Sequence, residues 1–238
     1  MGKNRVGKIF PTNNCGDIEL IEHKGKQIYD VRFSDGTIVK DITFGRIIEK
    51  TVKNPNEKNI YNVACIGEGV LPKDNKIAYK HWINMIQRVY CEKYKSLYPT
   101  YKNTSVSPMW LVFKEFLKWF ENNYVENWVL DKDIIGKENK IYSPETCIFV
   151  PAEINALFRK HSKSNTGLQG VTKVYNGKFY SKGCGNYIGT FDTIEEAVKS
   201  CVDYKTNKLK NLILLYDSIL PLKTKEILEN INFNIYYL

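Results

Sequence analysis

The stretch NWVLDKDIIGKENKIYSPETCIFVPAEINALFRKH, residues 127–161, contains the pattern that decides the fold of the central part of the chain. Its apolar runs at 129–134 and 147–150 predict two short strands, separated by a turn-rich segment. Pro151 suits the first turn of a helix, which we expect to continue through Lys160. A strand–loop–strand–helix unit of this size can hold one divalent metal ion between a strand carboxylate and a helix side chain.

Two helices are predicted before this stretch, because apolar residues recur there with a helical period. The first helix places five of them on one face: Trp82, Met85, Ile86, Val89 and Tyr90. The second, after a break at Ser107-Pro108, has a similar set: Trp110, Phe113, Phe116, Leu117 and Phe120. Between them lies an aromatic loop with Tyr94, Tyr98 and Tyr101, whose rings we interpret as core packing.

The first third of the chain has the alternation of apolar and polar residues that is typical of strands. Residues 26–44 alternate on both sides of Asp35-Gly36, which predicts a β-hairpin. Further short apolar stretches at 18–21 and 60–66 extend the pattern. We therefore expect a small β domain over residues 1–72, followed by a linker.

The last third predicts a small sheet and a helix. Three short apolar stretches, at 170–175, 178–181 and 187–191, read as strands, with Asn176-Gly177 as a hairpin turn. Thr193 suits the N-cap of the helix that follows. The predicted fold class is thus α+β. We expect the chain to be organised in four segments, which are 1–72, 76–161, 162–216 and a helical tail over 217–238.

Composition narrows the class of protein. With 238 residues, of which 43% are hydrophobic and 26% charged, the chain is neither disordered, collagen-like nor a disulfide miniprotein. The six cysteines occur singly, without a C-x-x-C pair, so we predict reduced thiols and no zinc site. No apolar run reaches the roughly 18 residues of a membrane span, and we expect a cytoplasmic protein without a membrane partner.

The net charge of +9 is concentrated in one segment. Residues 154–191 contain no Asp or Glu, although they include many Lys and aromatic residues. The alternative interpretation of this segment is a solubilising surface. Lysines interleaved with aromatic rings instead favour contact with nucleic acid. The candidate DNA-binding residues are Arg159, Lys160, Lys163, Lys173, Tyr175, Lys178, Tyr180 and Lys182.

A series of motifs runs through residues 76–162. Its first block is Tyr79, Trp82, Met85, Arg88, Tyr90 and Cys91, and its second block is Trp110, Phe113 and Phe116. The third block is Leu130, Asp131, Lys132, Asp133, Asn139, Tyr142, Pro144 and Cys147, followed by Asn155. In this order and spacing, the segment resembles the HNH (ββα-metal) homing endonucleases of phages and bacteria. The resemblance implies a phage or mobile-element protein that cleaves DNA.

The same resemblance implies a metal site and four catalytic positions. Asp131 would be the strand ligand and Asn155 the helix ligand of Mg²⁺ or Mn²⁺, with Lys132 and Asp133 beside them. In that family, a His beside the strand ligand takes a proton from the attacking water. Lys132 occupies the position of this His. A lysine, with an ordinary pKa near 10.4, is protonated at neutral pH and cannot act as a base there. His23, His81 and His161 are the only histidines, and none lies in the hairpin.

A second resemblance covers residues 162–210. The segments SNTGLQGV at 164–171, KFY at 178–180 and YIGTFDTIEEAV at 187–198 are similar to the APETALA-type DNA-binding domain. In that family a three-stranded sheet enters the major groove of double-stranded DNA and a helix braces the sheet from behind. A ribbon of strands fits a groove about 12 Å wide.

Three functions remain open from the sequence. The protein could be a metal-dependent endonuclease in which a metal-bound hydroxide, Asp133 or Glu145 replaces the missing His. It could instead bind DNA with a degenerate hairpin that no longer cleaves. According to the third hypothesis, the protein contacts a host or phage protein through residues 1–72, for regulation or counter-defence.

Overall fold

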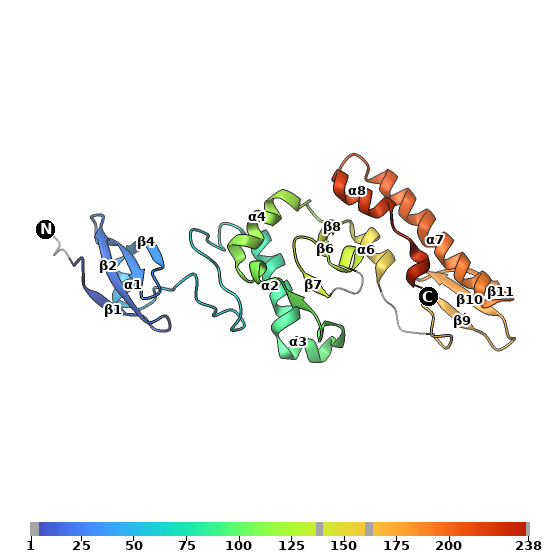
Figure 1. Ribbon diagram of the computed structural model, residues 1–238, viewed down its shortest axis with the longest axis horizontal. Coiled ribbons are helices and arrows are strands. Elements are labelled where there is room, and N and C mark those ends of the chain that lie inside the picture. Colours follow the sequence, from blue (N-terminus) through green and yellow to red (C-terminus); the bar gives the residue numbers. More distant parts are fainter. Residues whose placement is uncertain (1–4, 137–139, 160–163, 237–238) are drawn as a thin grey trace. The chain divides into compact units, whose positions relative to one another are not determined.

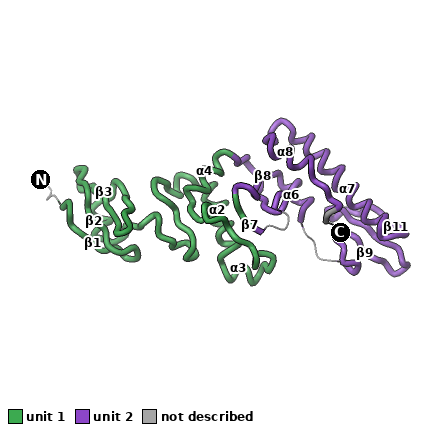
Figure 2. The backbone as a smooth tube through the Cα atoms, viewed as in Figure 1, with its two compact units in different colours: residues 1–122, 141–143 green, residues 123–140, 144–238 purple. Residues whose placement is uncertain are grey.

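The computed structural model describes residues 5–136, 140–159 and 164–236 of the chain (Figure 1). It combines antiparallel sheets with separate helices, which confirms the α+β class. The chain divides into two compact units (Figure 2). The first unit comprises Met1–Asn122 with Ile141–Ser143, and the second comprises Asn123–Lys140 with Pro144–Leu238. The expected segment 76–161 is therefore shared between the two units.

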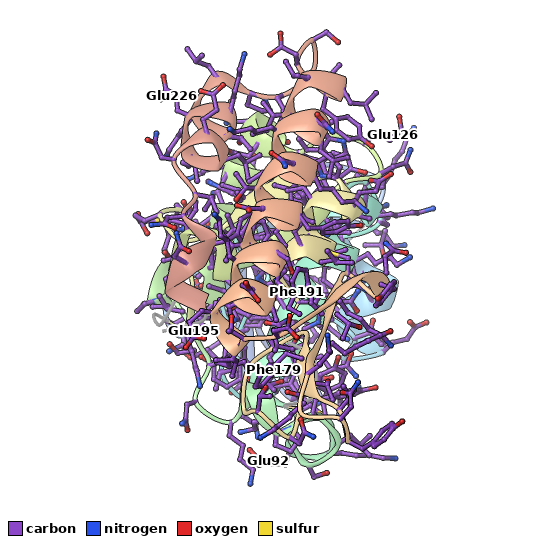
Figure 3. All side chains as sticks on the ribbon, turned by 90° about the vertical axis from the view of Figure 1, so that its right-hand side faces the viewer. Glu92, Glu126, Phe179, Phe191, Glu195 and Glu226 are labelled. Atoms are coloured by element: carbon purple, nitrogen blue, oxygen red, sulfur yellow. The ribbon has the colours of Figure 1, made fainter. Side chains whose placement is uncertain are left out.

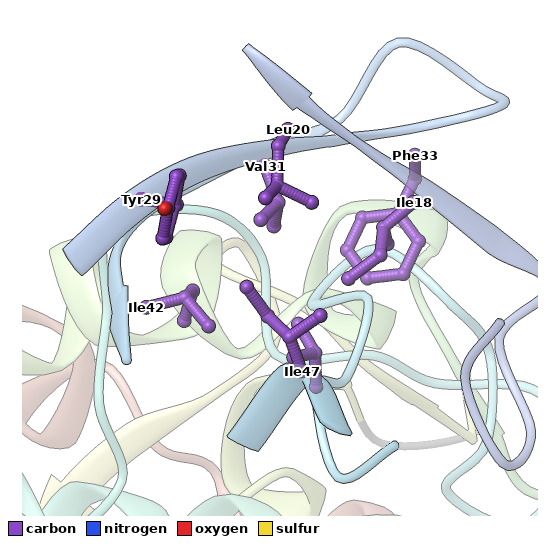
Figure 4. Packing of buried hydrophobic residues seen from close by; sticks show 8 residues of the cluster. Ile18, Leu20, Tyr29, Val31, Phe33, Ile42 and Ile47 are labelled. Atoms are coloured by element: carbon purple, nitrogen blue, oxygen red, sulfur yellow. The ribbon is translucent and has the colours of Figure 1, made fainter. Parts of the chain in front are cut away.

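The first unit begins with a four-stranded antiparallel meander and a short helix. In chain order these elements are β1 (Ile9–Pro11), β2 (Asp17–His23), β3 (Ile28–Phe33), β4 (Ile38–Thr43) and α1 (Phe44–Ile48). Alternate strand residues form the core with Ile47 of the helix (Figure 4). The predicted hairpin at Asp35-Gly36 is confirmed as the β3–β4 turn, where Gly36 has a φ of +89°. The predicted strand at 60–66 is wrong, because only isolated bridges form there.

Helices predominate in the first unit from residue 76 onward. They are α2 (Lys76–Tyr90), α3 (Glu92–Leu97), η1 (Pro99–Tyr101), η2 (Pro108–Leu111) and α4 (Phe113–Asn123), with strand β5 (Ser105–Val106) between η1 and η2. Both predicted apolar faces are buried, except for the half-buried Tyr90. The Trp82 indole donates a hydrogen bond to the carbonyl of Trp110 over 2.7 Å. The aromatic loop differs from its predicted core role, since 51% of Tyr98 is exposed.

The hairpin and helix predicted from residues 127–161 are present, with shorter strands. Strand β6 (Val129–Asp131) pairs antiparallel with β8 (Ile148–Val150), and α6 (Ala152–Phe158) follows. Between the strands lie α5 (Asp133–Gly136) and β7 (Ile141–Tyr142), the latter paired parallel with β5. The predicted strand over 129–134 is thus wrong in its second half, because the chain turns into α5 after Asp131. The predicted end of α6 at Lys160 lies outside the described residues.

The C-terminal sheet and helix are confirmed. The elements are β9 (Val171–Lys173), β10 (Phe179–Gly183), β11 (Asn186–Phe191) and α7 (Ile194–Leu215), and the strand order is β11-β10-β9. Thr193 caps α7 through a reciprocal pair of hydrogen bonds with Glu196. Phe179 and Phe191, paired across β10 and β11, pack beside this helix (Figure 3). One face of the sheet is therefore covered by the first half of α7.

The second half of α7 packs on other partners. The tail forms α8 (Leu222–Glu229) and η3 (Phe233–Tyr236), and Phe233 is buried. The Phe233 ring stacks on Phe158 of α6 at 5.3 Å between centroids, and the ammonium of Lys205 lies 5.6 Å from the same centroid. Tyr216, at the end of α7, donates a hydrogen bond to Glu153 of α6 over 3.2 Å. Helix α7 thus joins the C-terminal sheet to the unit that β6, β8 and α6 form.

None of the helices that the structure describes is both long and apolar enough to cross a membrane.

The packing around Lys205 can be tested by substitution. This side chain is only 5% exposed, and burial lowers its pKa. The folded protein then binds this proton less tightly than the unfolded chain, so wild-type stability rises with pH between the lowered folded value and the ordinary value of 10.5. We expect Lys205→Met, which keeps the length and can contact the Phe233 ring through sulfur, to be more stable by about 1 kcal/mol near pH 7.

The advantage of Lys205→Met should shrink as the pH rises to about 9.5, as measured by urea unfolding. Lys199→Met is the matched control, because Lys199 is exposed on the same helix and its substitution should change stability by less than about 0.5 kcal/mol. A Lys205→Met protein less stable than wild type at neutral pH would contradict this account.

Candidate metal hairpin and nucleic-acid interface

Asp131 is the strand carboxylate that the sequence assigns to a metal. It ends β6, is 8% exposed, and accepts hydrogen bonds through Oδ1 from the backbone N–H groups of Asp133 and Ile134, each over 2.8 Å. This pattern is a helix cap, and it explains why the strand ends and α5 begins at this point. Burial raises the pKa of Asp131, although the two N–H groups oppose the shift.

Lys132 and Asp133 form an ion pair beside this carboxylate. The Lys132 ammonium, 7% exposed, contacts Oδ1 of Asp133 at 2.5 Å. An ammonium held by a carboxylate donates hydrogen bonds and cannot accept a proton from water. In the described chain, the Lys132 charge is therefore compensated by Asp133 and is mostly shielded from solvent.

Asn155 lies in α6, the helix that packs beside β6, and its side chain is half-buried. Asp131 and Asn155 offer carboxylate and amide oxygens, which are the oxygen donors that Mg²⁺ accepts. Mg²⁺ is often bound by one or two protein ligands, with water and substrate phosphate completing the shell. The donor types therefore fit such an ion. Among the described residues, no group of three or more His, Cys, Asp or Glu side chains could hold a metal.

Neither described histidine belongs to the hairpin. His23 stacks on Tyr29 in the N-terminal sheet, with ring centroids 4.7 Å apart. His81 lies in α2 beside Phe120, where burial lowers its pKa. His161 lies outside the described residues. Within the described chain, the hairpin carries no imidazole that could act as a base.

The C-terminal sheet has two distinct faces. Phe179 and Ser181 of β10 point toward α7, since Phe179 packs in the core and the Ser181 and Ser200 hydroxyl oxygens are 2.7 Å apart. Successive residues of a strand alternate between faces, so Tyr180 and Lys182 point to the opposite side. The helix side is filled by core residues, and the opposite side is exposed to solvent.

We name the opposite side the outer sheet face, and it includes Lys178, Tyr180, Lys182, Tyr187, Thr190 and Thr172, the β9 partner of Tyr180. The rings of Tyr180 and Tyr187 stack with centroids 5.0 Å apart, and the Lys182 ammonium lies 5.2 Å from the Tyr180 centroid. The Tyr187 and Thr190 hydroxyl oxygens are 3.2 Å apart. Tyr187 is 59% exposed. The face thus presents a lysine charge, two rings and several hydroxyl groups together.

Only some of the predicted DNA-binding residues lie on this face. Lys178 does, but it pairs with Asp192 at 2.9 Å, just beyond the acid-free segment. Lys173 is paired with Phe179 across β9 and β10, so it lies on the helix side of the sheet. Its ammonium is 6.0 Å from the Phe179 ring centroid. Tyr175 is fully exposed at the β9–β10 turn.

The remaining predicted contacts lie before the sheet. Arg159 is exposed directly after α6, and its carbonyl accepts a hydrogen bond from the Gln169 side chain. Lys160 and Lys163 fall outside the described residues. The basic segment is therefore not one continuous surface in the described chain, because the strand alternation and the Asp192 pair divide it.

Tyr187 and Thr190 are missing from the predicted contact set. Their strand was predicted, and in the structure it pairs with β10, so that Tyr187 is opposite Lys182 and Thr190 opposite Tyr180. The alternation rule alone could have placed Thr190 on the exposed side, two residues before Asp192. Tyr187 requires the bulge in the β10–β11 pairing, which shifts its side chain to the outer face.

Comparison with known proteins found no match to the chain among protein-family models, curated proteins or solved structures.

The Asp131 cap can be tested by two substitutions. Asp131→Ala removes the acceptor of two backbone N–H groups and should lower stability by about 0.5–2 kcal/mol. Asp131→Asn keeps a side-chain oxygen in the same place and removes the buried charge, so it should be the more stable of the two variants. The measurement is urea unfolding followed by circular dichroism.

The pH dependence of the same variants tests the raised pKa. The folded state holds the Asp131 proton more tightly than the unfolded chain, so this group loses stability as the pH rises from the ordinary 3.8 through the raised folded value. The stability of Asp131→Asn relative to the wild type should increase over that pH range and should remain increased at higher pH. A gain that is independent of pH would contradict the raised pKa.

Proposed function

We propose that this protein binds double-stranded DNA through the outer sheet face. The observation that carries the proposal is the stack of the half-buried Tyr180 on the exposed Tyr187, with the Lys182 ammonium near the Tyr180 ring. Lysine contacts phosphates, while hydroxyl groups and aromatic rings contact sugars and base edges. Two or three strands fit the width of a major groove. The resemblance of residues 162–210 to APETALA-type domains supports the same use of the sheet.

The charge composition of the face indicates how specific this binding is. Lys178 and Lys182 are its cations, and no arginine belongs to it. Arginine is the usual source of bidentate contacts to guanine, so we expect phosphate contact and shape to dominate recognition. Affinity should therefore fall steeply as the salt concentration rises from about 50 to 200 mM. A protein-binding surface would not require such a dependence.

The test of the outer sheet face is DNA affinity in a double variant, Tyr180→Ala with Lys182→Gln. Loss of one aromatic contact and one phosphate contact should weaken binding to a mixed-sequence duplex by about tenfold or more, measured by fluorescence anisotropy. Lys199→Gln is the control, because it removes an exposed lysine from α7. Equal affinities for the double variant and this control would refute the proposed face.

A second candidate function is metal-dependent DNA cleavage. The succession of β6, β8 and α6, with Asp131 at the end of the first strand and Asn155 in the helix, is the observation that favours it. A bound Mg²⁺ or Mn²⁺ would stabilise negative charge on the scissile phosphate. Asp131 and Asn155 would hold that ion. The attacking water would need an acceptor other than Lys132, and Asp133 is engaged by that lysine.

The cleavage candidate is tested with Asp131→Asn, which keeps the helix cap. Supercoiled plasmid should be nicked by the wild type in Mg²⁺ or Mn²⁺ and left intact in EDTA, and the variant should lose at least about tenfold in rate while still binding DNA. Intact plasmid with every metal, together with salt-sensitive binding, would show a DNA-binding protein with a hairpin that does not cleave.

Cytoplasmic location and a host or phage protein partner for residues 1–72 remain predictions from the sequence.

A further inference from the structure

One end of the outer sheet face carries a pair of opposite charges. Phe179 and Phe191 are paired across β10 and β11 and pack toward α7. The next residues outward are Lys178 and Asp192, and strand alternation directs their side chains to the opposite side of the sheet. The Lys178 ammonium lies 2.9 Å from Oδ1 of Asp192, as expected for two side chains on one side.

Both members of this pair are accessible to a ligand. The side chain of Lys178 is 48% exposed and that of Asp192 is 78% exposed. An ion pair with this exposure contributes little to stability, so the ammonium and the carboxylate can turn toward a ligand at low cost. The three strands β9, β10 and β11 contain no acidic residue. Asp192 therefore adds a negative charge beside a surface whose strands carry none.

A carboxylate on a DNA-binding face has few possible partners on the DNA. Phosphate groups repel it, and the hydrogen-bond donors in the major groove are the amino groups of cytosine and adenine. The cytosine N4 amino group has one acceptor beside it, O6 of the paired guanine. The adenine N6 amino group lies between two acceptors, its own N7 and O4 of the paired thymine. A carboxylate is therefore accommodated better at cytosine.

The charge pair of Lys178 and Asp192 matches the major-groove edge of a G·C base pair. Its donor and acceptor are 2.9 Å apart, which is a hydrogen-bond distance. Cytosine N4 and guanine O6 are hydrogen-bonded to each other within the base pair, so they have a similar separation. The carboxylate can accept from N4 while the ammonium donates to O6 and N7 of guanine. At an A·T pair, the ammonium offsets one of the two acceptors beside the carboxylate, and the other still repels it.

We propose that Asp192 and Lys178 together select a G·C base pair in the major groove, with Asp192 on cytosine and Lys178 on guanine. This inference rests on the proposed DNA binding through the outer sheet face and adds a base-specific contact to it. Lys182 is the other cation of that face, and it contacts phosphate. The charge pair thus gives specificity at one position of a site that is otherwise recognised through its backbone and shape.

The experiment selects bound duplexes from a DNA library with a randomised central segment, using the full chain. The affinities of selected duplexes are then measured by fluorescence anisotropy. The variants are Asp192→Asn, which keeps the size of the side chain, and Lys178→Met, which keeps its length without the charge. Asp203→Asn is the matched control, because Asp203 is an exposed acid of α7. Circular dichroism of each protein reports whether it is folded.

We expect the wild type to select a G·C pair at one position and to bind about tenfold more weakly when that pair is reversed or replaced by A·T. Asp192→Asn should lose this preference and favour A·T there, because an amide offers the donor and acceptor that adenine N7 and N6 require. Lys178→Met should also reduce the preference for G·C. A merely structural ion pair would change the melting temperature of both variants and leave the selected sequence unchanged.

The inference is overturned if Asp192→Asn selects the same sequence as the wild type and Asp203→Asn. It is also overturned if the wild type selects no base at any position. Should Asp192→Asn fail to fold, Lys178→Met decides by the same criterion. Selection of an A·T pair by the wild type, lost in Asp192→Asn, would overturn G·C as the target.

The double variant Tyr180→Ala with Lys182→Gln separates this inference from the proposed function. If it binds more weakly and Asp192→Asn leaves the selected sequence unchanged, the proposed function stands and the base-specific contact fails. If the double variant keeps full affinity while Asp192→Asn alters the selected sequence, the base-specific contact stands and the rest of the outer sheet face fails. Absence of any binding to duplex DNA overturns both.

Discussion

The organisation of the second compact unit depends on helix α7, which packs against two sets of partners. Its first half covers the three-stranded sheet, and its second half packs on α6 and the C-terminal tail. Phe233 fills the junction, stacked on Phe158 and lying near the Lys205 ammonium. Because one continuous helix carries both contacts, the described parts of the sheet and the hairpin belong to one compact unit.

This shared helix has a consequence for function. The outer sheet face points away from α7, while the hairpin with Asp131 packs through α6 on the other half of the same helix. If the sheet binds DNA, the hairpin belongs to the same compact unit as the bound face.

Asp131 shows how a structural role and a chemical role compete for one carboxylate. One oxygen holds two backbone N–H groups and starts α5, and burial disfavours the charged form. A cation at the second oxygen would restore the charged form and relieve that cost. The neighbouring ammonium of Lys132 is already paired with Asp133. Asp131 therefore has a structural role at the start of α5 that does not require a metal.

The sequence by itself determined the elements whose signals are local. The alternation around Asp35-Gly36, the helical faces of Trp82 and Trp110, and the Thr193 cap each depend on residues a few positions apart, so they were predictable. The end of β6 was not, because Asp131 caps α5 instead of extending the strand. Only the tertiary structure paired β5 with β7 across more than thirty residues, and only the strand register separated Lys173 from Lys182. Charge can be counted along a chain, but the face on which each charge lies is decided by pairing between distant segments.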